Sequence, residues 1–423
     1  MRTYEKTLEA LRRVSIFNCV VEDRATSLVI EMIGPSHPIS TGNELFRVLA
    51  EASELDDQPP VGNAWQNYLL NTILSDDNVF ARKAELSGLD GVGPSLLAQV
   101  RSEMKTLRAL YDIKLDRLLT PLPSLGGFKP LNALSPAEAR LALKQRLHES
   151  TDWTECAAEL AKYYAATGSG IFGHYSAFRW ARGAEGGYLR GVASPDPIKL
   201  SDLIEYDWQR EDVRRNTRKL LAGLPVNNML LYGDRGTGKS STVKAMLNEF
   251  AGSKLRLVEV AKENLTDLPQ ILAIMRKRTE KFILFIDDLS FEENETQYKA
   301  MKAVLEGGLE ARPANVALYA TSNRRNIVKE RFSDRNIEDD EVHPGDTMQE
   351  KLSLADRFGL KLPFLAPDQE EYMRIVTALA SREGIELTDD LRKKALAWQH
   401  ARSGRSARQF VDYVVGEKAL EEN

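Results

Sequence analysis

The chain has 423 residues, of which 43% are hydrophobic and 28% are charged, and its formal net charge is -5. This length and composition predict a globular protein of two or three domains. The slightly acidic balance argues against a protein that coats a polyanion over its whole surface. The two cysteines, Cys19 and Cys156, lie far apart without a CxxC pattern, which favours a reducing cytosol over a disulfide framework or a zinc site. No apolar run approaches the ~20 residues that cross a bilayer, and the first residues lack the pattern of a signal peptide, so we expect a cytoplasmic protein without a membrane partner.

The first part of the chain is predicted to be mainly helical. Over residues 1–118, apolar residues recur at three- and four-residue spacing, as at Val100 and Met104. A stretch rich in Pro and Gly at 120–136 is typical of a linker, and a further helical pattern follows it. We therefore expect a helical N-terminal domain with linkers over 1–197.

Three segments leave alternatives open. Residues 86–100, LSGLDGVGPSLLAQV, resemble a helix-hairpin-helix, and we interpret them as a packing unit, with a contact to DNA phosphates as the alternative. Aromatic residues alternate with Gly and Arg over 167–183, which favours packing between domains over a nucleic-acid or partner surface. Residues 332–350 hold seven acidic side chains, which indicates a solvated loop, with a partner-facing loop as the alternative.

After about residue 198 the pattern changes to strands and helices in alternation. Short apolar runs joined by helices predict a parallel sheet with helices on both faces, which is a doubly wound α/β core. From Asp368 the pattern is helical again, and Asp368 with Glu371 forms a candidate capping box. We expect the core at 198–366 and a small helical lid at 367–423. The predicted strands are 228–233, 255–261, 281–287, 315–321 and about 359–364, and the predicted lid helices are 368–383, 388–402 and 406–420.

A phosphate-binding loop directly follows the first of these strands. The stretch GDRGTGKSS, residues 233–241, fits the pattern G-x-x-x-x-G-K-[ST]. Its glycines let backbone N–H groups turn toward phosphates at a helix N-terminus, Lys239 would reach the β- and γ-phosphates, and Ser240 would bind Mg²⁺. The residues predicted to hold the nucleotide here are Gly233, Gly236, Thr237, Gly238, Lys239, Ser240 and Ser241.

Polar residues at two further strand ends complete the predicted chemistry. In KFILFIDDLS, Asp287 would hold the metal, and Asp288 would orient and deprotonate the attacking water. In NVALYATSNRRN, Asn323 would lie near the γ-phosphate and hold that water. The sequence thus predicts a site for ATP and Mg²⁺.

Two arginines extend this site. Arg357, in SLADRFGLKL, is too far along the core to reach its own nucleotide, and we expect it to enter a neighbouring subunit's site as an arginine finger. Arg408, in SGRSARQF, is the candidate lid arginine that contacts the γ-phosphate, and Arg405 competes with it for this role.

These motifs, in this order, resemble those of the AAA+ ATPases. The wording is closer still to a bacterial branch known as domain of unknown function 815, with similar segments DLIEYDWQREDVRRNT, LLYGDRGTGKSS, FILFIDDLSFE, LSLADRFGL and SGRSARQF. The resemblance implies a five-stranded core, and it implies that Leu203, Ile204 and Tyr206 help form the adenine pocket. One departure from the broad AAA+ pattern is the pair Asp287-Asp288 in place of Asp-Glu, and the shorter second side chain is expected to slow turnover.

The function we predict is an Mg²⁺-dependent AAA+ ATPase that acts as a homo-oligomer on an unknown protein, or on DNA. The alternative is a nucleotide-gated, DNA-associated loader or binding module in which hydrolysis is slow. The sequence does not name the client.

Overall fold

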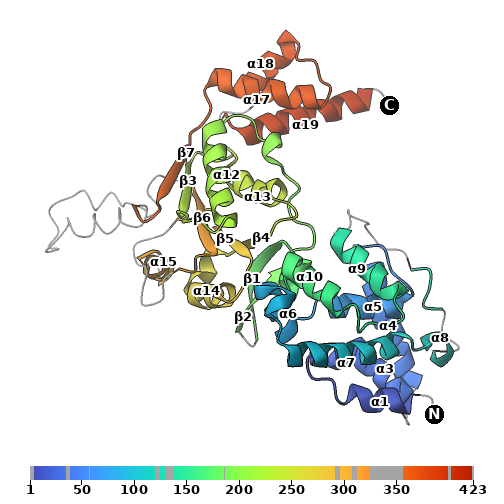
Figure 1. Ribbon diagram of the computed structural model, residues 1–423. Coiled ribbons are helices and arrows are strands. Elements are labelled where there is room, and N and C mark those ends of the chain that lie inside the picture. The colour runs from blue at the N-terminus through green and yellow to red at the C-terminus, as the bar shows by residue number, and fades with distance from the viewer. Residues whose placement is uncertain are drawn as a thin grey trace. The chain divides into compact units, whose positions relative to one another are not determined.

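The structure is a computed structural model that describes residues 4–34, 39–56, 58–119, 124–128, 138–184, 186–290, 296–306, 312–323, 356–398 and 402–421. The chain divides into two compact units, Met1–His174 and Tyr175–Asn423 (Figure 1). Within the described ranges, no helix is long and apolar enough to cross a membrane. The segment 332–350, for which a solvated loop was predicted, lies outside the described residues.

The first unit is built from helices, as the spacing of its apolar residues predicts. Its core contains the fully buried rings of Trp65, Trp153, Tyr164 and Phe80, which belong to one hydrophobic cluster. The main helices are α1 (Glu5–Leu11), α2 (Asn18–Glu22), α3 (Arg24–Ile33), α4 (Ile39–Glu54), α5 (Ala64–Leu74), α6 (Val79–Ser87), α7 (Pro94–Tyr111), α8 (Leu115–Leu118), α9 (Glu138–Glu149), α10 (Ala157–Thr167) and α11 (Ile171–His174).

The segment 86–100 forms the predicted turn between two helices. Helix α6 ends at Ser87, Gly88 has a φ of 64°, and α7 begins with Pro94 at its first turn. Val100, Met104 and Leu107 of α7 are fully buried in the core of this unit. The buried face of α7 is the face that the apolar spacing predicts. This agrees with the interpretation of residues 86–100 as a packing unit.

The second unit contains a seven-stranded sheet in the order β2-β1-β4-β5-β6-β3-β7. All five strands that the sequence predicts are present, and they pair in parallel. Strand β5 is buried along almost its whole length, as an apolar run in a parallel sheet requires. These five strands are β3 (Met229–Gly233), β4 (Leu255–Glu259), β5 (Lys281–Ile286), β6 (Val316–Ser322) and β7 (Leu360–Phe364).

Two further strands, which the sequence analysis did not identify, extend the sheet. Strands β1 (Ala177–Gly183) and β2 (Gly186–Gly191) form an antiparallel hairpin, and β1 pairs in parallel with β4. Two aromatic residues of 167–183, Phe178 and Trp180, therefore belong to the sheet, where they are almost fully buried. The two compact units divide between His174 and Tyr175, just before this hairpin.

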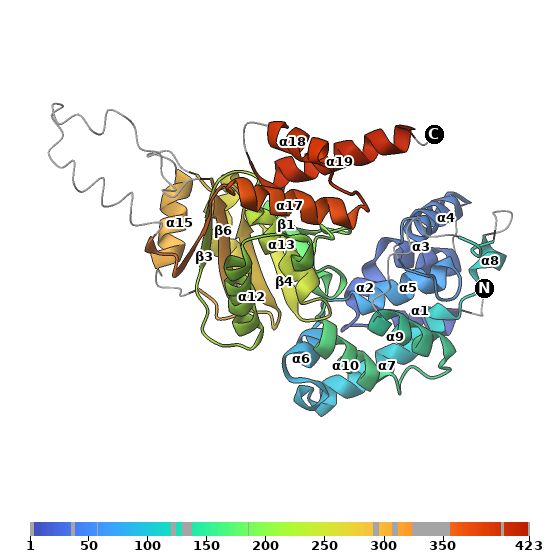
Figure 2. The same ribbon diagram turned by 90° about the horizontal axis from the view of Figure 1, so that it is seen from above.

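Helices cover both faces of the sheet, as predicted for a doubly wound core. Helices α12 (Asp207–Leu221) and α13 (Lys239–Glu249) share one hydrophobic cluster with one face. The alternate side chains of β5, such as Phe282 and Leu284, point to the opposite face and are fully buried. Figure 2 shows α15 (Thr296–Glu306) on the far side of the sheet from α13, and α14 (Leu268–Arg276) lies beside α15.

The lid consists of three helices with a hydrophobic cluster of their own. They are α17 (Gln369–Arg382), α18 (Asp389–Ala397) and α19 (Gly404–Glu421). The predicted capping box is present: the Glu371 N–H donates to Asp368 Oδ1 at 2.8 Å, and the Asp368 N–H donates to Glu371 Oε2 at 2.9 Å. Helix α17 therefore starts where the sequence predicts.

Candidate functional site

The phosphate loop runs from Gly233 at the end of β3 to α13. Three glycines of the loop have positive φ angles that residues other than glycine rarely adopt: 130° at Gly233, 75° at Gly236 and 91° at Gly238. At Gly233 a Cβ would also lie 2.2 Å from the carbonyl oxygen of Phe364 in β7. Because α13 begins at Lys239, its unpaired N–H groups and the positive end of its dipole face this loop, which is an arrangement that binds anions.

The Lys239 ammonium lies inside the curve of the loop. The side chain is only 6% exposed, and Nζ donates to the carbonyl oxygens of Gly233 at 2.9 Å and Asp234 at 2.6 Å. Burial lowers the pKa of Lys239, and the nearby carboxylates of Asp234, Asp288 and Asp287 act in the opposite direction. A phosphate oxygen would be a stronger partner for this ammonium than a backbone carbonyl, because both partners would then be charged.

Three oxygen-bearing side chains meet at the ends of β5 and β6. Ser240 Oγ donates to Asp287 Oδ1 at 2.6 Å, and Thr321 Oγ1 donates to the same oxygen at 2.5 Å. A hydroxyl and a carboxylate are the hard ligands that Mg²⁺ takes from proteins, with phosphates and water supplying the rest. The residues present therefore fit the metal that the sequence predicts. No group of three or more His, Cys, Asp and Glu residues suited to a metal occurs in the described parts of the chain.

Asp288 is turned away from Asp287 by its backbone. Its φ is 50°, in the left-handed region that Asp adopts more readily than most residues. The Asp288 N–H donates to Thr321 Oγ1 at 2.9 Å, and its carboxylate accepts from Asn323 Nδ2 at 2.5 Å. The two carboxylates thus have separate partners: Asp287 is directed to Ser240, and Asp288 to Asn323.

The predicted base pocket lies between the core and the lid. Leu203, Ile204 and Tyr206 line the same cavity as the phosphate loop, together with Ile375 and Leu379 of α17. The Tyr206 ring lies over Phe364, with ring centroids 5.0 Å apart, and its hydroxyl donates to the Leu365 carbonyl at 2.6 Å. Apolar side chains from two sides suit a flat aromatic base.

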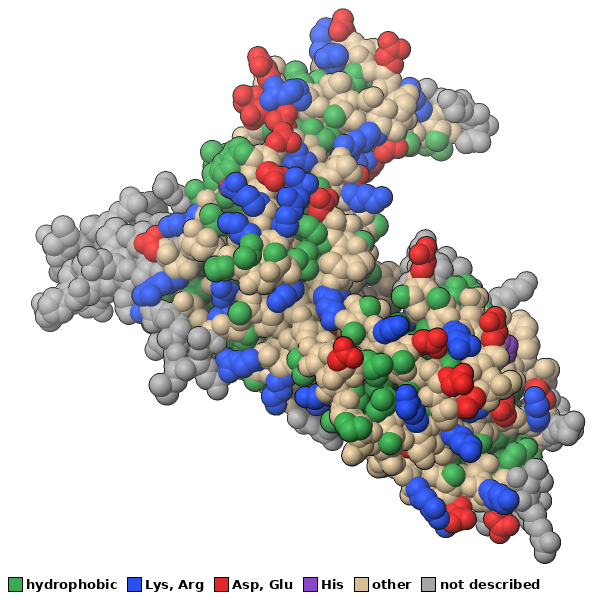
Figure 3. All heavy atoms as spheres, in the orientation of Figure 1, with side chains coloured by type: hydrophobic (Ala, Val, Ile, Leu, Met, Phe, Trp, Pro, Cys, Tyr) green, Lys and Arg blue, Asp and Glu red, His purple; other side chains and the backbone are tan. Residues whose placement is uncertain are grey.

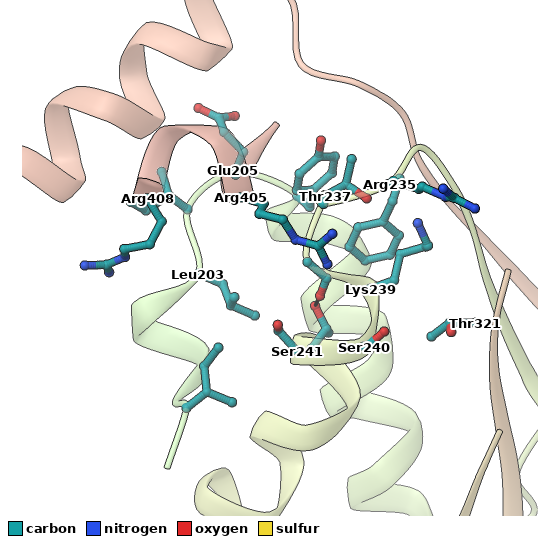
Figure 4. A pocket seen from close by; sticks show the side chains of 18 of the residues that line it. Leu203, Glu205, Arg235, Thr237, Lys239, Ser240, Ser241, Thr321, Arg405 and Arg408 are labelled. Carbon is teal, nitrogen blue, oxygen red and sulfur yellow. Dashed lines mark hydrogen bonds between the residues drawn. The ribbon is translucent and has the colours of Figure 1, made fainter. Parts of the chain in front are cut away.

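The two candidate lid arginines have different surroundings. Ser403 Oγ accepts from the Ser406 N–H at 3.1 Å and so caps α19, which places Arg405 in the first turn. The Arg405 backbone N–H donates to the Gly236 carbonyl at 3.1 Å, and Figure 4 shows its side chain reaching over the loop beside Thr237. Arg408 also lines the cavity, but its guanidinium donates to Glu383 Oε1 at 3.1 Å and points away from the loop (Figure 4). Arg405 is therefore the better placed of the two.

One cavity of about 680 Å³ joins these parts. Two of the predicted site residues, Arg357 and Gly233, are not in its lining, and Arg357 lies exposed, three residues before β7. The predicted residues that the cavity brings together are Leu203, Ile204, Tyr206, Gly236, Thr237, Gly238, Lys239, Ser240, Ser241, Asp287, Asp288, Asn323 and Arg408, and Gly233 is bonded to Lys239 beside them.

Sequence reasoning missed two contributors. Thr321 connects both aspartates, and its position two residues before Asn323 was the available signal, because residues i and i+2 of a strand share a face. Asp234, within the loop, accepts from the Ala366 N–H at 2.6 Å and so fastens the loop to the segment after β7. No pattern in the sequence indicated that contact.

The fold and the site define the class of protein. A sheet of mostly parallel strands with a phosphate loop after β3, carboxylates after β5, an amide after β6 and a helical lid over the loop is the arrangement of a P-loop AAA+ core. The profile of the family described as "Protein of unknown function (DUF815)" matches residues 173–418, which is more than half of the chain. The chain belongs to this family.

Other comparisons found more distant likenesses. The RuvB Holliday junction branch migration motor of Thermotoga maritima is similar at 17% identity with a TM-score of 0.38, over 53% of this chain and 67% of that one. A FIGL-1 AAA domain in complex with ADP is similar at 15% identity with a TM-score of 0.36, over 53% of this chain and 75% of that one. No curated protein matches the sequence.

Proposed function

We propose that the protein is an Mg²⁺-dependent ATPase. The observation that supports this most directly is the pair of separated carboxylates at the end of β5, with Asp287 bonded to Ser240 and Asp288 bonded to Asn323. One carboxylate suits a metal and the other suits a water molecule. A protein that only held a nucleotide would need the first of these and not the second.

Each residue then has a defined task. Lys239 and the N–H groups at the start of α13 bind the phosphates, and Ser240 and Asp287 hold Mg²⁺, which would neutralise charge on the phosphates when bound. Asp288 takes the proton of the attacking water, and Asn323 fixes the position of the Asp288 carboxylate. Arg405, from the lid, supplies a positive charge above the phosphate loop. Leu203, Ile204 and Tyr206 hold the base.

We also propose that the active form is a homo-oligomer. Arg357 is exposed and lies outside the lining of its own cavity, which supports a role for it at the nucleotide of a neighbouring copy. Hydrolysis would then require contact between subunits. The movement of one subunit against the next, driven by hydrolysis, would act on a protein or DNA client.

The test is the rate of phosphate release by the purified full chain, with and without Mg²⁺. Asp288→Asn is expected to lower kcat by about 10²- to 10⁴-fold, the range of a lost general base, and to leave ATP binding intact. Asp390→Asn, at an exposed lid carboxylate paired with Lys394, is the matched control and should be without effect. Turnover that is equal in Asp288→Asn and in the unaltered chain would refute the assignment of the base.

The second candidate function is a nucleotide-gated module that captures DNA or a protein. It is favoured by Asp288 itself, because Asp is one methylene shorter than the Glu of the broader AAA+ pattern. Negligible turnover of the unaltered chain, combined with ATP-dependent capture of DNA, would support this module and overturn the ATPase.

A further inference from the structure

The loop at residues 200–206 forms one wall of the base pocket, and two arginines bond its backbone. Arg210 Nη1 donates to the carbonyl oxygens of Leu200, at 3.0 Å, and Leu203. Arg382 Nη1 donates to the carbonyl of Asp202 at 2.9 Å, and its Nη2 donates to the carbonyl of Ser201 at 2.5 Å. Four successive carbonyl groups, from Leu200 to Leu203, are thus held by guanidinium groups.

The two arginines come from different parts of the unit. Arg210 lies on α12 of the core, where Asp207 also accepts from its guanidinium. Arg382 is the last residue of α17 in the lid. A second lid arginine on the same helix, Arg374, donates from Nε to Glu205 Oε1 at 2.7 Å. The loop is therefore bonded to the core from one side and to the lid from the other.

The loop has a conformation that needs such support. Glu205 and Tyr206 are consecutive residues with φ angles of 66° and 61°, and neither is glycine. Residues other than glycine are strained in this region and keep this conformation only where the surroundings hold them. The arginine contacts are polar restraints that reach this loop from the lid, and Ile204 of the loop also packs against the hydrophobic cluster of the lid.

We propose that Arg382, assisted by Arg374, is a positioning residue that couples the base pocket to the lid. The inference rests on the proposed function, because it assigns a role in binding the ATP base. When the lid moves away, the carbonyls of Ser201 and Asp202 lose their donors, and the wall formed by Leu203 and Ile204 loosens. By linkage, a nucleotide that orders this wall also favours the docked lid, and the two effects are equal in free energy.

The first experiment measures hydrogen–deuterium exchange of a peptide covering 200–206 in the protein without nucleotide. Arg382→Ala is expected to exchange faster there than the unaltered chain, and Arg382→Lys, which keeps the charge but loses the planar fork, to lie between them. Lys394→Ala is the matched control, because it removes an exposed lid cation whose ion pair is with Asp390 of its own helix. If Arg382→Ala does not fold, Arg374→Ala breaks the other lid contact and is read in the same way. Unchanged exchange in both variants would overturn the proposal.

The second experiment measures binding of a fluorescent ATP analogue and the rate of hydrolysis. Arg382→Ala should weaken binding by about three- to tenfold, the range of one or two lost hydrogen bonds to a charged donor at an exposed position. KM should rise by a similar factor while kcat is unchanged, because Arg382 touches no reacting atom. A fall in kcat at unchanged KM would contradict a positioning role.

The two experiments separate this inference from the proposed function. Faster exchange of 200–206 in Arg382→Ala would support the coupling even if the unaltered chain hydrolysed no ATP. Normal ATP hydrolysis together with unchanged exchange and unchanged binding in Arg382→Ala would leave the ATPase in place and remove the coupling.

Discussion

At the scale of single residues, Thr321 is the group on which both aspartates depend. Its hydroxyl donates to Asp287 Oδ1 and accepts from the Asp288 N–H, so one side chain fixes the metal ligand and the backbone of the base together. Thr321→Val keeps the shape and removes both hydrogen bonds. Because partners of metal ligands commonly change metal affinity or activity by about 10- to 100-fold, we expect kcat to fall by that order and the Mg²⁺ requirement to rise.

The measurement is a titration of ATPase rate with Mg²⁺. Thr217→Val is the control, because Thr217 is also a fully buried threonine whose hydroxyl makes two hydrogen bonds, to the Val213 carbonyl and to Tyr319, but it lies outside the site. An Mg²⁺ dependence that shifts equally in both variants would show that the effect comes from lost stability and not from the site.

The two lid arginines show what a sequence can and cannot settle at this scale. Motif order places Arg405 and Arg408 equally well, because both lie in the first turns of one helix. The choice between the two arginines depends on Glu383, the residue directly after α17. Its carboxylate accepts a hydrogen bond from the Arg408 guanidinium, which therefore points away from the phosphate loop. That contact joins residues 25 positions apart, and no local pattern reveals it.

At the scale of elements, the β1–β2 hairpin is joined to the core by the pairing of β1 with β4, by the ion pair of Arg179 with Glu259, and by the carboxylate of Asp267. Asp267, at the end of the 3-10 turn η3 (Lys262–Asp267), accepts from Arg182 Nη2 at 2.8 Å and from Trp180 Nε1 at 2.9 Å. The hydrogen bond from Arg182 is the main cause that lowers the pKa of Asp267 from 3.8 to about 2. A lowered pKa means that the folded state favours the ionised form, so this stabilisation is present above about pH 4 and is lost as pH falls toward 2.

We therefore predict that Asp267→Asn lowers the free energy of unfolding by about 1–2 kcal/mol at neutral pH and accelerates hydrogen exchange in 177–191. The difference from the unaltered chain should shrink as the pH falls from about 4 toward 2, because Asp267 is protonated first in the unfolded chain and only near pH 2 in the folded protein. Asp196→Asn, at an exposed residue of the following loop, controls for the loss of a charge. A stability difference that persists unchanged at pH 2 would contradict this role of the carboxylate.

The elements that could be predicted are those whose burial is continuous. The apolar run at 281–286 predicts a central strand because both of its faces are apolar. The start of the lid helix at 369 is predicted by a different signal, the capping box of Asp368 and Glu371. The hairpin at 177–191 could not be found in this way. Gly187 and Gly191 leave room for the rings of Trp180 and Tyr175, since a Cβ at either glycine would lie 2.1 Å from a ring atom. In the sequence alone, glycines at this density indicate a linker and not a strand.

At the scale of the whole molecule, the proposed arginine finger makes activity a property of an assembly. Arg357→Ala should abolish most turnover, since arginine fingers contribute about 10³- to 10⁵-fold to kcat, and it should leave ATP binding by each subunit intact. Size-exclusion chromatography with light scattering should also show that ATP promotes oligomers. Full activity in a strictly monomeric preparation would contradict this.

Mixing two inactive variants gives the sharpest test of action between subunits. Lys239→Ala has no working phosphate loop but keeps Arg357, and Arg357→Ala has the reverse defect. When equal amounts are mixed and allowed to exchange subunits, about a quarter of the sites pair an intact loop with an intact neighbouring arginine, and activity should return to about that fraction. If Arg357 acted within its own subunit, every site in the mixture would lack one of the two groups. The mixture would then stay as inactive as its components, because no arrangement of the subunits could complete a site.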